Sequence, residues 1–120
     1  MHSERLLEHF RNPRNVGELE APAKVVDVSN PACGDLLRLS VRFEDDRVAE
    51  VKYQVRGCTA SIAAGSVLTE WMQGKSRGEL KTLTAAMIEE GLGGLEAASK
   101  HAAVLSLDGL KRLLFLTKEP

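Results

Sequence analysis

The two cysteines of this chain, Cys33 and Cys58, each stand beside a glycine in a segment that breaks regular structure. The first lies in NPACGD (residues 30–35) and the second in RGCT (residues 56–59). Proline, glycine and aspartate favour tight turns, and a thiolate on an exposed turn can reach a metal ion or a sulfur donor. We therefore expect the chemistry of this protein to lie between these two loops.

Each cysteine loop carries a second feature that supports this chemistry. Gly34 gives the backbone the freedom to bring the Cys33 thiolate and the Asp35 carboxylate to one point. Cys58 directly precedes a predicted helix, whose free amide groups and dipole stabilise a thiolate. The alternative, at equal weight for each residue taken singly, is that Cys58 is a small buried apolar residue and Asp35 a turn-former.

Of the three histidines, His101 is the one placed to join these side chains. It follows a glycine-rich joint at residues 91–94, so packing of the last helix can return it to the strand ends. His2 in the terminus and His9 on a short exposed helix are interpreted as surface or satisfied core residues. The resulting donor set has two sulfurs, one oxygen and one nitrogen, which suits a tetrahedral Zn²⁺ or iron site although no CxxC motif is present. Its members are Cys33, Asp35, Cys58 and His101.

Other kinds of chemistry find little support in the sequence. The glycines form neither of the phosphate-binding fingerprints, GxxxxGK[ST] and GxGxxG. Ser61 and Ser66 have no partnered base in sequence reach, which argues against a serine nucleophile. Four basic residues of the predicted strands form either a partner-docking patch or a solvated face, and the solvated face is favoured. They are Arg38, Arg42, Lys52 and Arg56.

With 120 residues, 43% of them hydrophobic and 28% charged, the chain is expected to form one domain spanning residues 1–120. Its net charge of −1 gives no reason to expect nucleic acid or an anionic membrane as partner. No apolar run approaches the roughly 18 residues of a membrane span. The N-terminus continues into an amphipathic stretch rather than a signal-peptide core, which predicts a cytoplasmic protein. In a reducing compartment, two free thiols are favoured over a Cys33–Cys58 disulfide.

The first half of the chain predicts one short helix and a meander of three antiparallel strands. Residues 3–11 place Leu6, Leu7 and Phe10 on one helical stripe, and the helix should end before Pro13. The strand segments are rich in valine or alternate between apolar and polar residues, which predicts one buried and one wet face. The predicted strands are residues 24–29, 36–44 and 48–56.

The second half of the chain predicts helices. Their expected ranges are residues 59–74, 79–83, 84–90 and 95–116. The first has an apolar face interrupted by small residues, and the last has an apolar stripe in which Gly109 is a weak point. The two stripes are Ile62, Val67, Leu68, Trp71 and Met72, and then Val104, Leu105, Leu110, Leu113 and Leu114. Strands followed by helices predict an α+β domain whose helices cover the apolar face of the sheet.

Four segments together resemble the IscU/NifU-like iron–sulfur cluster assembly scaffolds. They are NPRNVGEL (12–19), NPACGDLLRLSV (30–41), YQVRGCTASIAAGSVLTEWMQGKS (53–76) and the weaker KHAAVLSLDGLKRLL (100–114). The resemblance covers nearly the whole chain, and the paired ACGD and GCxxSIA blocks are specific to the family. It implies a short N-terminal helix, a three-stranded antiparallel sheet and a covering helical layer.

The resemblance also implies a function. Members of this family accept sulfur from a cysteine desulfurase, assemble a [2Fe–2S] cluster with iron and pass it to apo-proteins, and some bind Zn²⁺ in the same pocket. Such a protein is not an enzyme, because the bond-breaking belongs to the desulfurase. Three residues match the two loop cysteines and the neighbouring aspartate of the family, and His101 matches the histidine before its third cysteine. These three are Cys33, Cys58 and Asp35, with Cys58 the expected persulfide acceptor and Asp35 an exchangeable ligand.

The chain departs from the family in two places. Ala102 stands where the family has its third cysteine, and the Leu-Pro-Pro-Val-Lys segment is absent near residues 95–99, which argues against delivery by the dedicated chaperone. Three hypotheses follow, in order of preference. The chain is a cluster scaffold with mixed ligands, a zinc-binding regulatory or sulfur-relay module that docks on a desulfurase, or a structural relative with an empty site.

Overall fold

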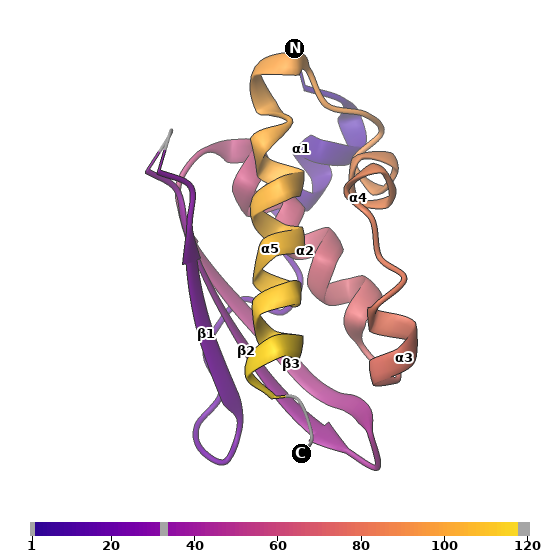
Figure 1. The fold of residues 1–120 in the computed structure, drawn as a ribbon. Coiled ribbons are helices and arrows are strands. Elements are labelled where there is room, and N and C mark those ends of the chain that lie inside the picture. The colour runs from indigo at the N-terminus through magenta and orange to yellow at the C-terminus, as the bar shows by residue number, and fades with distance from the viewer. Residues whose placement is uncertain (1, 32–33, 118–120) are drawn as a thin grey trace.

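The computed structural model describes residues 2–31 and 34–117 and has the predicted α+β architecture. Three antiparallel strands lie in the order β1-β2-β3, and helices pack on one face of this sheet (Figure 1). In chain order the elements are α1 (Glu4–Arg11), β1 (Lys24–Ser29), β2 (Leu36–Glu44), β3 (Arg47–Arg56), α2 (Thr59–Met72), α3 (Arg77–Leu80), α4 (Ala85–Gly91), the 3₁₀ turn η1 (Ala97–Ser99) and α5 (His101–Leu116). The described helices include none that is long and apolar enough to cross a membrane.

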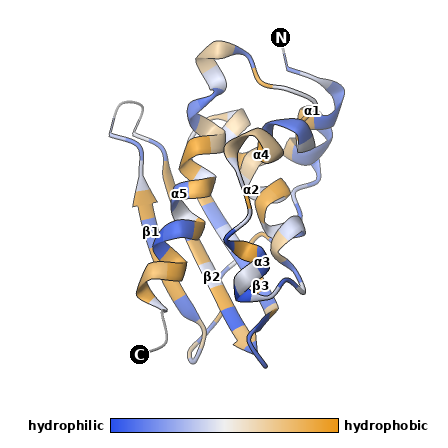
Figure 2. Cartoon of the chain, turned by 45° about the vertical axis from the view of Figure 1, so that its right-hand side comes forward, coloured by the Kyte–Doolittle hydropathy of each residue, from blue (hydrophilic) through white to orange (hydrophobic). Residues whose placement is uncertain are grey.

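The sheet follows directly from the alternation of its residues. Leu37, Leu39 and Val41 of β2 are fully buried under the helices, and hydrophobic and hydrophilic residues alternate visibly along this strand (Figure 2). Leu39 pairs with Tyr53 of β3, so that large side chains meet on the buried face. All three predicted strands are confirmed, with β3 beginning one residue earlier than predicted.

Helix α2 approaches the sheet through its small residues. Ala60, Ala63 and Ala64 are at most 1% exposed, and a Cβ on Gly65 would lie 2.3 Å from the ring of Tyr53. The small residues are therefore the contact surface with β3, and the prediction that they interrupt an apolar face was wrong. Large side chains there would hold the helix away from the strand, whereas small ones let the two backbones approach.

Helix α5 differs from its predicted form at its start and on its buried face. The predicted range began at residue 95, but Gly93 and Gly94 have positive φ and only the short turn η1 precedes His101. Val104 is 47% exposed rather than in the core. Gly109, predicted as a weak point, is where the helix meets β2, because a Cβ there would lie 2.6 Å from Leu37.

Of the two short helices between α2 and α5, α3 begins two residues earlier than predicted and ends three residues earlier, and α4 begins and ends one residue later than predicted. Helix α3 begins at Arg77 because Ser76 and Glu79 form a capping box, in which each side chain binds the backbone N–H of the other. Helix α4 begins after Thr84, whose hydroxyl accepts from the Met87 N–H. The capping hydroxyls therefore set both starting points.

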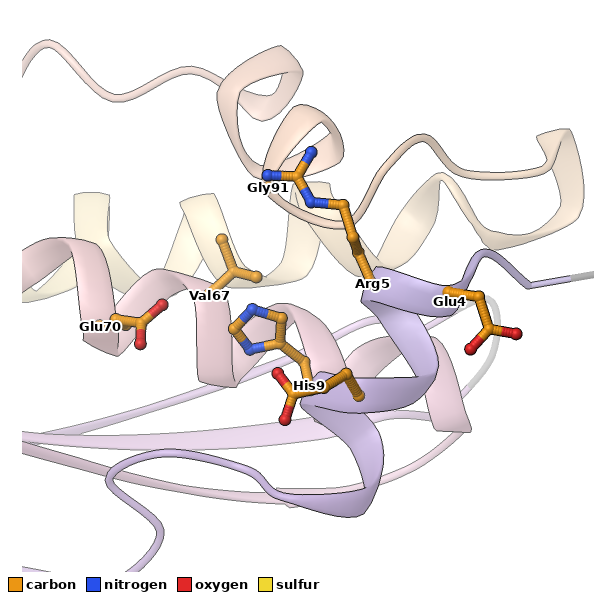
Figure 3. Close-up of a pocket in the computed structure, with 7 residues that line it drawn as sticks. Glu4, Arg5, His9, Val67, Glu70 and Gly91 are labelled. Carbon is orange, nitrogen blue, oxygen red and sulfur yellow. The ribbon is translucent and has the colours of Figure 1, made fainter.

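Helix α1 buries His9 rather than Phe10, which corrects the prediction that Phe10 belongs to the buried stripe, whereas His9 is a satisfied core histidine, one of the two interpretations given to it. Phe10 is 37% exposed, whereas His9 is 9% exposed and lines a pocket of about 480 Å³ between α1 and α2 (Figure 3). The Ser66 hydroxyl accepts from the Arg14 backbone N–H at 3.0 Å, so its own hydrogen is available for Nδ1 of His9 at 2.8 Å. This arrangement makes Nδ1 an acceptor and the ring neutral.

The solvated-face interpretation of the basic strand residues agrees with the ion pairs formed there. Arg38 binds the carboxylates of Asp27 and Glu18, and Arg42 binds those of Glu44 and Glu50. These two guanidinium groups are neutralised within the chain. They do not form an unbalanced positive patch.

The buried histidine makes stability dependent on pH. Burial lowers the pKa of His9 below its ordinary value of 6.5, and Arg14 lowers it further, against the opposing effect of Glu70 and Glu8. As the pH falls below 6.5, His9 becomes protonated in the unfolded chain but stays neutral in the folded chain. The free energy of unfolding therefore decreases until the pH falls below the pKa of His9 in the folded chain. We expect His9→Asn, which keeps an acceptor near Ser66 but cannot titrate, to remove this component. Urea unfolding at several values between pH 7.5 and 5 measures it, and parallel curves for the two proteins would contradict the expectation.

The close contact of α2 with Tyr53 gives a second prediction. Gly65→Ala places a methyl group 2.3 Å from a ring carbon of Tyr53 and should lower the free energy of unfolding by about 1–3 kcal/mol, because the helix must move away from the strand. Gly78→Ala is the matched control, since the nearest atom to its Cβ is 3.9 Å away. Urea denaturation followed by circular dichroism compares the two. Equal free energies of unfolding for the two variants would show that the contact of Gly65 with Tyr53 does not limit how closely α2 packs on β3.

Candidate metal centre

Three chain segments that carry predicted ligands meet at one end of the molecule. The start of β2, the start of α2 and the start of α5 lie together there, although α5 follows α2 by about thirty residues (Figure 1). Packing of α5 against α2 and the sheet returns His101, its first residue, to the strand ends. Cys33 lies outside the described residues.

Asp35, Cys58 and His101 form a compact set of ligand atoms. One atom from each lies within 4.8 Å of the others, and among the described residues this is the one such group of histidine, cysteine and acidic side chains. Nε2 of His101 is 3.6 Å from Sγ of Cys58 and 3.6 Å from Oδ2 of Asp35. His2 and His9 lie on or before α1 and are not part of the group.

The carboxylate of Asp35 is buried against the N-terminus of α2. It is 6% exposed, and its Oδ2 accepts from the Cys58 backbone N–H at 3.4 Å and from the Ser61 hydroxyl at 2.6 Å. The positive end of the helix dipole stabilises a negative charge at this position. The carboxylate therefore compensates the free amide end of α2, which Cys58 itself leaves without a side-chain cap.

The turn before Asp35 is closed by two backbone hydrogen bonds. The Gly34 N–H donates to the Asn30 carbonyl at 2.7 Å, and the Asn30 N–H donates to the Asp35 carbonyl at 2.9 Å. Gly34 has φ +77, a conformation that glycine adopts without strain. This turn directs Asp35 inward, so the expectation of an exposed turn is wrong for the aspartate.

Gly57 is the residue that lets Asp35 approach. A Cβ on Gly57 would lie 2.5 Å from the Asp35 carboxyl carbon and within 2.8 Å of both oxygens. Only a residue without a side chain leaves room for the carboxylate. The predicted role of Gly57 was to end β3, which it does after Arg56; its contact with Asp35 had no signal in the sequence.

Cys58 is the exposed member of the group. Its free thiol is at the N-cap position of α2, as the sequence predicts, and the thiol donates to the Ser61 hydroxyl at 3.4 Å. Ser61 was dismissed as a nucleophile and received no other role. It nevertheless lies three positions after Cys58 on one helical face, and this spacing was the signal available.

The donor chemistry of these residues fits a transition metal. A thiolate, an imidazole and a carboxylate together suit Zn²⁺ or iron, whereas Mg²⁺ and Ca²⁺ prefer oxygen alone. In a tetrahedral metal site, these three ligand atoms would leave the fourth coordination position for a further ligand. The pocket beside His9, with Glu4, Arg5 and Glu8 in its lining, contains no such group among the described residues.

The chain is an α+β domain with a candidate sulfur, nitrogen and oxygen site at one end. Solved structures with the same fold exist. A NifU-like N-terminal protein from Brucella abortus superimposes with a TM-score of 0.76 at 21% identity, covering 94% of this chain and 91% of that one. The SUF-system protein FiSufU from Fervidobacterium islandicum AW-1 gives 0.75 at 23% identity, with 94% and 96% covered.

Sequence comparison identifies the family. Residues 1–115 match the NifU-like N terminal domain, and the chain belongs to this family. The scaffold protein IscU 1 of Archaeoglobus fulgidus is 40% identical over 114 residues, covering 95% of this chain and 74% of that protein. IscU of Azotobacter vinelandii is 37% identical, with 92% and 88% covered. A bifunctional NifU/MnmA protein of Rubrobacter xylanophilus is 44% identical over 90% of this chain but 22% of its own length. The resemblance inferred from the sequence is thus confirmed.

The Gly57 contact provides a test of the centre. Gly57→Ala forces the Asp35 carboxylate away from α2 and should weaken binding of Co²⁺, a visible-absorbing substitute for Zn²⁺, by about 10-fold. Gly78→Ala serves as control. Titration followed by absorption measures both, and unchanged affinity in Gly57→Ala would remove Asp35 from the ligand set.

Proposed function

We propose that this protein is an iron–sulfur cluster assembly scaffold, which accepts sulfur from a cysteine desulfurase, assembles a [2Fe–2S] cluster with iron and transfers it to apo-proteins. The observation that carries the proposal is the meeting of Asp35, Cys58 and His101 within 4.8 Å. Curated relatives over most of the chain are named as iron–sulfur cluster assembly scaffold proteins. In this function iron and sulfide are substrates that the protein passes on, and they are not a resident cofactor.

Cys58 is the proposed sulfur acceptor because its thiol is exposed and lies at a helix N-terminus. A Cys58 thiolate attacks the terminal sulfur of the desulfurase persulfide, the sulfur–sulfur bond breaks, and the desulfurase thiolate leaves. The helix end stabilises the attacking anion. The scaffold itself needs no catalytic base for this exchange, which supports a non-enzyme role. A free thiol also fits a reducing compartment and supports the cytoplasm as the location.

The proposed ligands of the cluster are Cys58, Asp35, His101 and Cys33, the last of which lies outside the described residues. Imidazole replaces thiolate at some [2Fe–2S] centres, so His101 is a suitable ligand. The oxygen of Asp35 binds iron more weakly than a thiolate does and exchanges more readily. Such a ligand favours transfer, because a cluster held only by thiolates leaves more slowly.

A second function is favoured by Ala102. This residue is 0% exposed in the core, where the family has its third cysteine, so one sulfur ligand is missing. A site with fewer thiolates suits a single Zn²⁺ ion, held by the same residues. The alternative is therefore a zinc-binding regulatory or sulfur-relay module that docks on a desulfurase without building a cluster.

Anaerobic reconstitution with iron, cysteine and a desulfurase distinguishes these functions. The scaffold should develop visible absorption and contain acid-labile sulfide, and both should be lost in Cys58→Ala and reduced in His101→Ala. His2→Ala is the matched histidine control, because His2 lies outside the ligand group. A colourless product with one zinc per chain, from protein purified without oxygen, would establish the zinc module instead.

A further inference from the structure

Ser61 touches two of the three described ligands although it offers no metal-binding group of its own. It is 1% exposed on α2, and its Oγ lies 2.6 Å from Oδ2 of Asp35 and 3.4 Å from Sγ of Cys58. We propose that Ser61 is a positioning residue, which holds the Asp35 carboxylate in the orientation that binds the metal. The inference rests on the proposed function, because it concerns the same centre.

The Ser61 hydroxyl donates its hydrogen bond to the Asp35 carboxylate. A carboxylate only accepts hydrogen bonds, so at 2.6 Å the hydroxyl must be the donor. The contact with Cys58 runs in the opposite direction, from the thiol to the hydroxyl oxygen. When a metal ion replaces the thiol hydrogen, the bond from Ser61 to Asp35 is therefore retained.

The same oxygen of Asp35 faces the ligand group. Oδ2 receives the bond from Ser61 and lies 3.6 Å from Nε2 of His101. The N–H of Cys58 reaches this oxygen at 3.4 Å, a longer and weaker contact. Of these two donors Ser61 makes the short bond, and it thereby fixes the rotation of the carboxylate toward Cys58 and His101.

If Ser61 had only a structural role, the loss of other buried serine hydroxyls should affect metal binding in the same way. Ser66, on the same helix, binds His9 and the Arg14 N–H, away from the ligand group. Ser40 is 0% exposed, and its hydroxyl has no hydrogen-bond partner among the described residues. Ser40→Ala is the control for loss of a buried hydroxyl, and Ser66→Ala is the control for loss of a hydrogen-bonded one within α2.

The test is a double-mutant cycle with Co²⁺ as the probe, followed by its visible absorption bands. Ser61→Ala should raise the dissociation constant about 10-fold, as expected when an outer-shell partner of a ligand is lost, and should change the band pattern. In the Asp35→Ala background, the same substitution should have no further effect, because no carboxylate remains to be held. Ser40→Ala and Ser66→Ala should bind Co²⁺ as the unmodified protein does.

Two results would overturn the inference and leave the proposed function in place. One is unchanged affinity and spectrum in Ser61→Ala. The other is the same 10-fold loss in the Asp35→Ala background, which would mean that Ser61 acts through Cys58 or the helix. A failure of the unmodified protein to bind Co²⁺ with a thiolate band would instead refute the proposed centre, and the positioning role with it.

Discussion

The buried charge of the Asp35 carboxylate is the constraint around which this end of the molecule is arranged. Moving an ionised carboxylate out of water costs several kcal/mol unless donors and positive dipoles compensate it. Here the compensation comes from the amide end of α2 and the Ser61 hydroxyl, and Gly57 leaves the space for it. The start of β2, the end of β3 and the start of α2 therefore depend on one another, and a change in any of the three should move a candidate ligand.

The position of the third candidate ligand, His101, depends on packing far from the site. His101 reaches Asp35 and Cys58 because α5 lies flat across β1 and β2, and Gly109 allows that approach to Leu37. Gly65 does the same for α2 against Tyr53. These two glycines thus set how closely α2 and α5 approach the sheet. Substitutions that enlarge these contacts should alter ligand distances even though they touch no ligand.

Residue alternation was enough to predict the strands, and the change to a helical period after Gly57 was enough to predict Cys58 at a helix start, because both patterns depend on local sequence. The predictions failed where a distant contact decides. The apolar stripe on α1 favoured Phe10 for burial, yet His9 is buried because Ser66 and Arg14 supply partners for its ring. Ser61 was missed for a related reason. Its spacing from Cys58 has meaning only once Asp35, 26 positions earlier, is known to lie beside it.

The start of α5 decides which side chain this segment offers to the candidate centre. Helix α5 starts at His101, and Ala102 is packed in the core with no exposed surface. Among the described residues this segment therefore contributes a nitrogen, from His101, to the group with Asp35 and Cys58. In the proposed centre, an oxygen ligand from Asp35 would add to this nitrogen, and the donor set would be harder than one built of thiolates alone, which would weaken the binding of iron or zinc.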